Sequence, residues 1–222
     1  MVLSDVVLDL FPGRPCDFSA PTLGRAQRVA FGIADLFLRC ARRQVLAGST
    51  RKVVIEVGEV GATSVRSILS TTFVSSPLPQ LCDDIGGLRK VLAMTLCDAL
   101  VTAAQRESWP LAPIRAACRE MRERAYCNTG RWPARAKRSR DGRLLAHIEY
   151  DYSSEVTRLW VCITDRKNVE KKRVLLLEKP SQEDDRGYLF GMLYWRSATR
   201  VCLDAKRTSE RFCVHVGADA YR

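Results

Sequence analysis

Nine cysteines and two histidines are the side chains best suited to nucleophilic or metal chemistry in this 222-residue chain. Cys213 and His215 lie two positions apart, so on a strand they share one face. With Cys162 or His147 they could form a nucleophile and its base, or a pair of zinc ligands. The chain has no C-x-x-C or H-x-x-x-H spacing, and cysteines on a sheet are more often simply buried. We therefore predict no catalytic residue, no metal site and no cofactor.

A loose nuclease-like pattern joins Asp151 to the D-x-K sequence that begins at Asp165. Residues 153–156 indicate a turn between two strands, which places Asp151 beside the turn and Asp165 at the far end of the next strand. At roughly 3.3 Å per residue, about 25 Å would separate the two carboxylates, too far to share one metal ion. The glycine-containing segment 58–64 is a weak phosphate loop because no lysine follows its second glycine.

The strongest functional signal is the basic segment 131–140, with the sequence RWPARAKRSR. Arginine forks suit bidentate phosphate contacts, and Trp132 offers a stacking surface for a base. The same run fits a nuclear localisation signal, and a solvated basic loop is the plain alternative. The candidate nucleic-acid-binding residues lie in this segment, on the helix expected before it and in a later strand connection: Arg115, Arg119, Arg122, Arg131, Trp132, Arg135, Lys137, Arg138, Arg140, Arg143, Lys171, Lys172 and Arg173.

The positive charge is concentrated in one stretch of the chain. The whole sequence has 36 basic and 25 acidic residues, a formal charge of +11. Residues 115–143 hold 10 basic and 3 acidic side chains and so carry 7 of these 11 charges, whereas the parts before and after carry +2 each. Such a cluster attracts phosphates or anionic lipid head groups through its summed field.

Helical periodicity dominates the first part of the chain. A helix of roughly five turns is indicated by apolar residues at alternating spacings of 3 and 4: Leu23, Ala26, Ala30, Ile33, Phe37 and Cys40. A second helix is expected between Pro79 and Arg106, and a third after Pro113 with Ala125 facing inward. Strands are expected at residues 6–11 and 52–57, while 63–74 is ambiguous. We interpret residues 1–128 as a mainly helical part.

The last part of the chain changes to a period of two. About six short strands are indicated, at residues 144–152, 157–164, 173–177, 188–195, 199–203 and 212–216. Their aromatic residues are core candidates, with base stacking as the alternative: Tyr150, Tyr152, Trp160, Tyr194 and Trp195. The prediction is an α+β fold in which the helical part packs on an antiparallel β meander or partly open barrel. Residues 129–143 are a basic linker and 144–222 the β part, or the whole chain is one compact domain.

Composition limits the class of protein. No apolar run reaches the roughly 20 residues of a transmembrane helix, and the N-terminus lacks a basic region typical of signal peptides. Nine cysteines without paired spacing indicate reduced thiols and a cytoplasmic or nuclear location.

These observations predict a non-enzymatic nucleic-acid-binding protein of accessory or structural type, with RNA favoured over DNA and a viral source consistent with the composition. One alternative is a matrix-like structural protein that binds anionic membrane surfaces and self-associates. Another is an interaction adaptor whose basic loop carries a nuclear localisation signal and docks on an acidic protein partner. A homo-oligomer is also expected.

Overall fold

The computed structural model describes residues 2–10, 20–41, 44–45, 47–58, 64–153, 155–181, 189–206 and 209–217, without the side chains of residues 20, 133 and 134. It divides into two compact units. Unit 1 comprises Met1–Asn128 with Ser153–Glu155, and unit 2 comprises Thr129–Tyr152 with Val156–Arg222. The centre of the glycine segment, residues 59–63, lies outside the described residues.

Unit 1 contains a four-stranded mixed sheet in the order β1-β2-β4-β3. Its strands are β1 (Asp5–Leu10), β2 (Lys52–Gly58), β3 (Ser64–Ile68) and β4 (Thr71–Pro77). Strands β1, β2 and β4 run parallel, and β3 forms an antiparallel hairpin with β4. Every second residue of β1, β2 and β4 is buried, so the sheet has one covered face.

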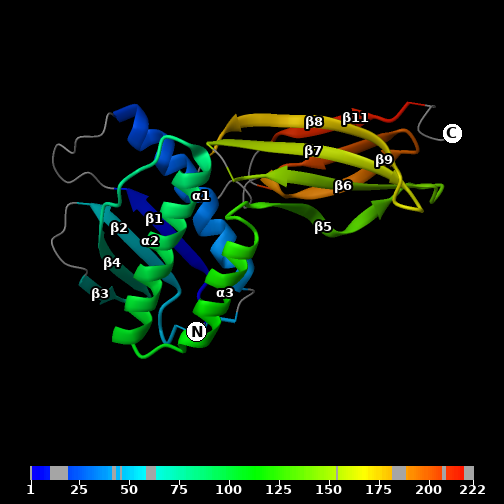
Figure 1. Cartoon of the computed structure of the whole chain (residues 1–222). Helices are drawn as coiled ribbons and strands as arrows, with labels where there is room; N and C mark the ends of the chain where they lie inside the picture. Colours follow the sequence, from blue (N-terminus) through cyan, green and yellow to red (C-terminus); the bar gives the residue numbers. More distant parts are fainter. Residues whose placement is uncertain are drawn as a thin grey trace. The chain divides into compact units, whose positions relative to one another are not determined.

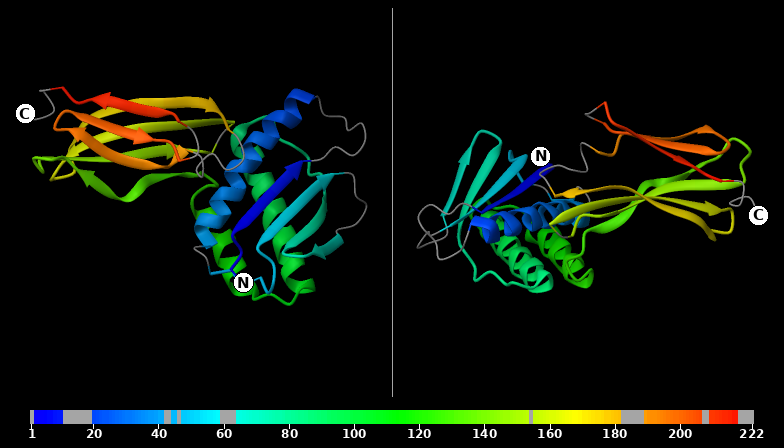
Figure 2. Two further views of the ribbon diagram at one scale, coloured as in Figure 1. Left: turned by 180° about the vertical axis from the view of Figure 1, so that it is seen from behind. Right: turned by 90° about the horizontal axis from the view of Figure 1, so that it is seen from above.

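Three helices lie on that face of the sheet, as Figure 2 shows from above: α1 (Ala20–Ala41), α2 (Ile85–Arg106) and α3 (Leu111–Glu123). The apolar stripe of α1 is buried from Ala26 to Cys40, as its spacing predicts. Helix α2 begins after Asp84, whose side chain accepts a hydrogen bond from the Gly87 amide at 2.7 Å. Helix α3 ends before Ala125, which is exposed with φ of 48°, so the prediction that Ala125 faces inward is wrong.

The prediction of a mainly helical N-terminal part is wrong. The described chain is mainly β, with three helices and three sheets, and one of these sheets lies in unit 1. Strand β1 pairs with β2, so that Asp5 lies opposite Lys52. These two strands are far apart in the sequence, and the apolar periodicity within each segment does not show which distant segment it pairs with. The serine- and threonine-rich stretch left ambiguous forms most of β3 and β4, whose partly exposed surface explains its diluted apolar pattern.

Unit 2 consists of two antiparallel sheets that form two layers (Figures 1 and 2). The first has the order β5-β6-β7-β8 and contains β5 (Thr129–Arg138), β6 (Leu144–Asp151), β7 (Val156–Asp165) and β8 (Glu170–Pro180). The second has the order β11-β10-β9 and contains β9 (Met192–Ser197), β10 (Arg200–Asp204) and β11 (Arg211–His215).

Several aromatic side chains of unit 2 pack in its interior. Phe190 lies 5.2 Å from the ring centroids of both Trp132 and Tyr150. Tyr150, Tyr152 and Trp195 are buried, so the preference for core positions over base stacking is confirmed for these three residues. The Trp195 indole donates to the Lys137 carbonyl at 2.9 Å and ties β9 to β5.

Segment 129–143 is not a linker. It forms edge strand β5 and the tight turn that leads into β6. Pro133 has no amide hydrogen to donate, and the ladder is irregular between Trp132 and Lys137, so the strand bulges at this point.

Candidate nucleic-acid interface

The positive charge of the chain is concentrated in unit 2. This unit holds 20 of the 36 basic residues and only 12 of the 25 acidic residues. Unit 1 holds the remaining 16 basic and 13 acidic residues. Unit 2 therefore carries most of the net positive charge that can attract an anionic ligand.

The edge strand β5 presents exposed basic side chains beyond its bulge. Arg135, Lys137 and Arg138 are exposed, and none of the three forms an ion pair within the described part of the chain. Trp132 is half-buried, and its ring stacks on Phe190 with an interplanar angle of 11°. One face of the Trp132 ring is therefore covered by the protein itself.

The turn between β5 and β6 is held by a network around one carboxylate. Ser139 donates from its hydroxyl to Asp141 at 2.6 Å, and the Arg143 amide donates to the same Oδ1 atom at 3.1 Å. The hydrogen bond from Ser139 is the main reason that the pKa of Asp141 lies below its ordinary value. Gly142 adopts φ of 71°, a conformation that favours glycine. Exposed Arg140 and Arg143 thus belong to a turn that these hydrogen bonds hold.

A second turn, between β7 and β8, is built in a similar way. Asp165 accepts from the amides of Lys167 at 2.8 Å and Val169 at 3.0 Å. The hydrogen bond from Val169 is the largest cause that lowers the pKa of Asp165. The exposed Lys167 side chain projects from this turn.

The sheet register brings both turns to the same end of unit 2 (Figure 1). Leu144, the first residue of β6, lies opposite Asp165, the last residue of β7. The Arg166 guanidinium donates to the Gly142 carbonyl at 2.6 Å and joins the two turns. We call this region the basic tip, and its basic members are Arg138, Arg140, Arg143, Arg166, Lys167 and Lys171.

Acidic residues at the basic tip are fewer and largely occupied. Asp141 and Asp165 accept the hydrogen bonds described above, and Lys171 approaches Asp165 at 3.8 Å. Glu170 is the third acidic residue of the region, at the start of β8. Six basic residues against three acidic ones leave a positive surface that can accept phosphate groups.

A separate cluster surrounds Glu149 on the face of the sheet opposite Trp132. Arg131 lies 3.1 Å from one carboxylate oxygen of Glu149 and Arg173 lies 3.1 Å from the other. Burial alone would raise the pKa of Glu149, but the hydrogen bond with His147 and the charges of Arg173 and Arg131 lower it below its ordinary value. Arg173 also stacks over Trp160 at 4.9 Å, beside an open hollow of about 330 Å³.

The thiol candidates do not form a catalytic pair. Cys213 is joined to Cys202 across β10 and β11, and Cys97 is joined to Cys118 between α2 and α3. The expectation of reduced thiols is therefore wrong for these four residues. Cys162 is fully buried, and burial followed by the negative charge of Glu149 raises the pKa of its thiol to about 12. A buried thiol with a raised pKa is a poor nucleophile.

The register also confirms that the nuclease-like pattern has the wrong geometry. Asp151 pairs with Arg158 at one end of the β6–β7 hairpin, and Asp165 pairs with Leu144 at the other end. The two carboxylates therefore cannot hold one metal ion.

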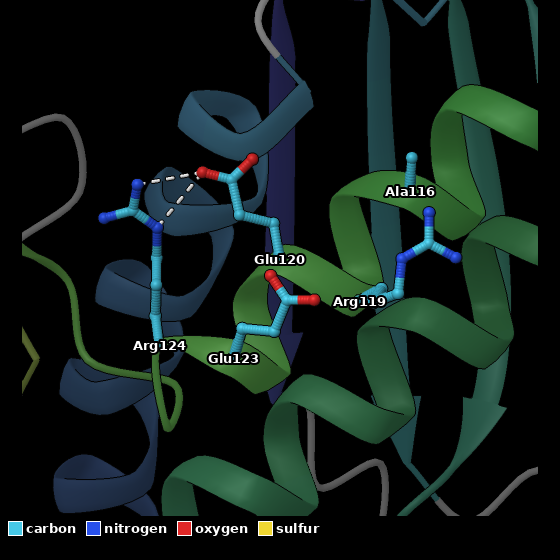
Figure 3. A pocket seen from close by; sticks show the side chains of 5 residues that line it. All are labelled: Ala116, Arg119, Glu120, Glu123 and Arg124. Atoms are coloured by element: carbon cyan, nitrogen blue, oxygen red, sulfur yellow. Dashed lines mark hydrogen bonds and ion pairs between the residues drawn. The ribbon is translucent and has the colours of Figure 1, made fainter.

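The predicted helical arginines belong to unit 1. Arg115, Arg119 and Arg122 are exposed on α3, whereas the other ten candidates belong to unit 2. Figure 3 shows acidic residues beside Arg119, in a hollow of about 500 Å³ where Glu120 pairs with Arg124 at 2.8 Å. The α3 surface is consequently mixed in charge, as expected for a solvated helix face.

The strand-connection candidates have separate roles. Lys171 joins the basic tip, and the Lys172 amine donates to the His215 carbonyl at 2.8 Å. Arg173 belongs to the Glu149 cluster. Sequence reasoning missed Arg166 and Lys167 as members of the tip, because only the hairpin register places them beside residues 138–143.

None of the described helices is long and apolar enough to cross a membrane. Comparison of the chain with family models, curated proteins and solved structures finds no match.

Proposed function

We propose that this chain is a non-enzymatic nucleic-acid-binding protein that contacts RNA or DNA phosphates through the basic tip of unit 2. The observation that carries the proposal is the meeting of two turns at one end of a sheet, joined by the bond from Arg166 to Gly142. Their basic side chains point outward, whereas Asp141 and Asp165 bind backbone amides of their own turns. Phosphate contacts of this kind give affinity with little sequence readout.

The proposal does not depend on Trp132 or Arg131. Trp132 stacks on Phe190, and Arg131 is paired with Glu149. Exposed Arg135 and Lys137 extend the same surface along the β5 edge. Charged residues on an edge strand also prevent the strand from pairing with other chains, which would explain Arg135 and Lys137 without any ligand. Mutations in the tip therefore test nucleic-acid binding more directly than mutations along the β5 edge.

The test is a salt titration of binding to labelled single-stranded RNA and duplex DNA. A tip variant carries Arg138→Ala, Arg140→Ala and Lys167→Ala, which removes three exposed charges but leaves the Arg166 bond to Gly142 in place. A control variant carries Arg196→Ala, Arg200→Ala and Lys206→Ala, which removes three exposed charges from the other sheet and its flank.

We expect the tip variant to bind more weakly and to flatten the slope of log affinity against log salt. Three lost phosphate contacts reduce that slope by about 2 to 3, at roughly 0.7 to 0.9 per contact. The control variant should flatten the slope much less, because it weakens long-range attraction but removes no phosphate contact. Equal slopes in all three proteins, or no nucleic-acid binding at physiological salt, would contradict the proposal.

An anionic membrane surface is the second candidate ligand. Val169 is 52% exposed and lies beside Lys167, so the tip combines an apolar residue with basic ones. Basic residues near an anionic lipid surface contribute about 1 kcal/mol each. Binding to phosphatidylserine-containing vesicles but not to RNA or DNA would favour this second function.

A further inference from the structure

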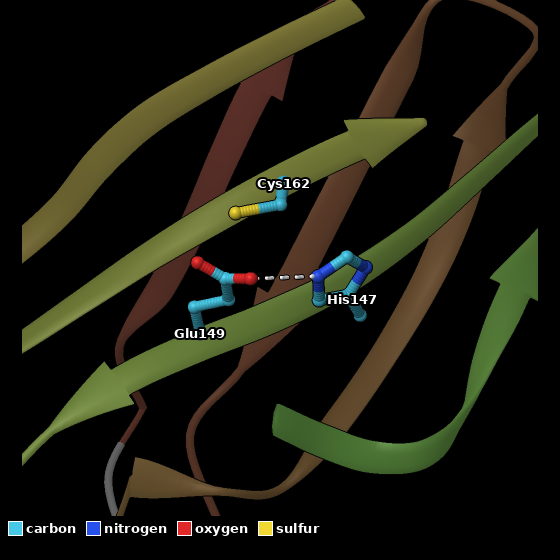
Figure 4. A group of neighbouring side chains, drawn as sticks. All are labelled: His147, Glu149 and Cys162. Atoms are coloured by element: carbon cyan, nitrogen blue, oxygen red, sulfur yellow. Dashed lines mark hydrogen bonds and ion pairs between the residues drawn. The ribbon is translucent and has the colours of Figure 1, made fainter. Parts of the chain in front are cut away.

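Three potential metal ligands meet on β6 and β7, away from the basic tip. They are His147, Glu149 and Cys162, and one ligand atom from each lies within 4.8 Å of the other two. Figure 4 shows the imidazole, carboxylate and thiol converging between the two strands. His147 is 5% exposed and Cys162 is fully buried, so the donors are removed from competing solvent.

The sheet itself fixes this arrangement. His147 and Cys162 are direct cross-strand partners, and Glu149 lies two positions after His147 on the same face of β6. Arg131 and Arg173 bind the Glu149 carboxylate from the flanking strands. Hydrogen bonds of this kind orient a ligating carboxylate around a metal site.

The donor set identifies the class of ion. A nitrogen, a sulfur and an oxygen donor together suit a borderline divalent cation such as Zn²⁺, whereas Mg²⁺ and Ca²⁺ prefer oxygen donors alone. Zinc bonds of about 2.0–2.3 Å place tetrahedral donors roughly 3.3–3.8 Å apart, so the side chains need to close by about 1 Å. The His147–Glu149 contact of 3.4 Å already lies within that span.

We propose that His147, Glu149 and Cys162 form a binding site for one Zn²⁺ ion in unit 2. The ion bonds to the imidazole nitrogen, one carboxylate oxygen and the sulfur, and the Cys162 thiol releases its proton to solvent. The thiolate and the carboxylate supply two negative charges to the ion, and Arg131 and Arg173 stay bonded to the carboxylate, so the occupied site keeps a net positive charge. Three protein donors leave the fourth tetrahedral position to water. Spacing rules applied to the sequence predict no metal site because these donors come from two facing strands. The proposal is independent of nucleic-acid binding.

The test is a titration of the metal-free full chain with Co²⁺ as a spectroscopic probe, followed by displacement with Zn²⁺. The Cys97–Cys118 and Cys202–Cys213 bonds are first verified by mass spectrometry, so that their sulfurs do not compete. We expect one tetrahedral Co²⁺ per chain, with a thiolate-to-cobalt absorption band that Zn²⁺ abolishes. Zn²⁺ should also raise the melting temperature of the wild-type protein.

Matched variants locate the site. Cys162→Ser should abolish the thiolate band and weaken Zn²⁺ binding about 100-fold, while Glu149→Gln should weaken it at least about tenfold and keep the band. Cys127→Ser, at a half-buried thiol of unit 1, should leave both unchanged. If Cys162→Ser does not fold, the Zn²⁺ affinity of Glu149→Gln tests the proposal instead. Absence of saturable binding, a band that persists in Cys162→Ser, or its loss in Cys127→Ser would overturn the proposal.

Discussion

Single carboxylates fix the conformation of the basic tip. Asp141 and Asp165 each bind backbone amides within their own turns, so neighbouring arginine and lysine side chains are free to face solvent. Sequence reasoning assigned Trp132 a stacking role because it lies among arginines. The register instead pairs Trp132 with Ile148, on the inner face of the sheet, where it meets Phe190. A one-residue difference in register decides between these two environments.

The Asp141 turn gives a pH prediction. Because the folded-state pKa of Asp141 lies below its unfolded value of about 4, its contribution to stability is present above pH 4 and is lost as the pH falls through the lower folded pKa. An NMR titration of the Asp141 carboxyl should therefore show a midpoint below the ordinary value of 3.8. In Ser139→Ala the midpoint should rise, since the Ser139 hydroxyl is the largest cause of the shift. A wild-type midpoint at or above 3.8 would contradict the hydrogen bonds described for this turn.

At the scale of elements, sequence signals locate most helices and strands but not every boundary or partner. The period-two pattern correctly predicts β6 and β7, and the apolar stripe correctly predicts α1. Strand β5 was missed because Pro133, a bulge and an exposed edge remove its alternation. The β1–β2–β4 sheet was missed as a unit because its partners are far apart in sequence. Pairing is a tertiary property that local propensity does not encode.

The start of α2 provides a test at this scale. Asp83 and Asp84 both precede α2, and of the two Asp84 is the N-cap and binds the Gly87 amide. We expect Asp84→Ala to lower the free energy of unfolding by about 1 kcal/mol. Asp83→Ala should change it by less than about 0.5 kcal/mol, because its exposed carboxylate does not cap the helix. Chemical denaturation followed by circular dichroism measures both. Equal losses would show that general charge near the helix start, not the cap, is responsible.

For the whole molecule, charge density along the sequence identifies part of the candidate surface. The dense segment 115–143 spans both units: Arg115, Arg119 and Arg122 belong to unit 1, and the other ten candidates belong to unit 2. Conversely, Arg166 and Lys167 belong to the tip although their turn, between β7 and β8, lies outside the charge-dense segment 115–143. Of the proposed Zn²⁺ donors, the sequence suggested His147 and Cys162 but not Glu149, and only the β6–β7 register makes the three residues neighbours.

The net charge of the molecule and the direct contacts of the basic tip should affect different rates of RNA binding. The tip and control variants each lower the formal charge from +11 to +8. Long-range attraction depends on the summed field, so both variants should slow association with RNA to a similar extent at low salt. Only the tip variant should also speed dissociation, since only it removes contacts made in the bound state. Stopped-flow or surface-based kinetics at two salt concentrations separates the two rates. If the control variant dissociates as fast as the tip variant, RNA is held by the diffuse charge of the molecule and the basic tip has no special role.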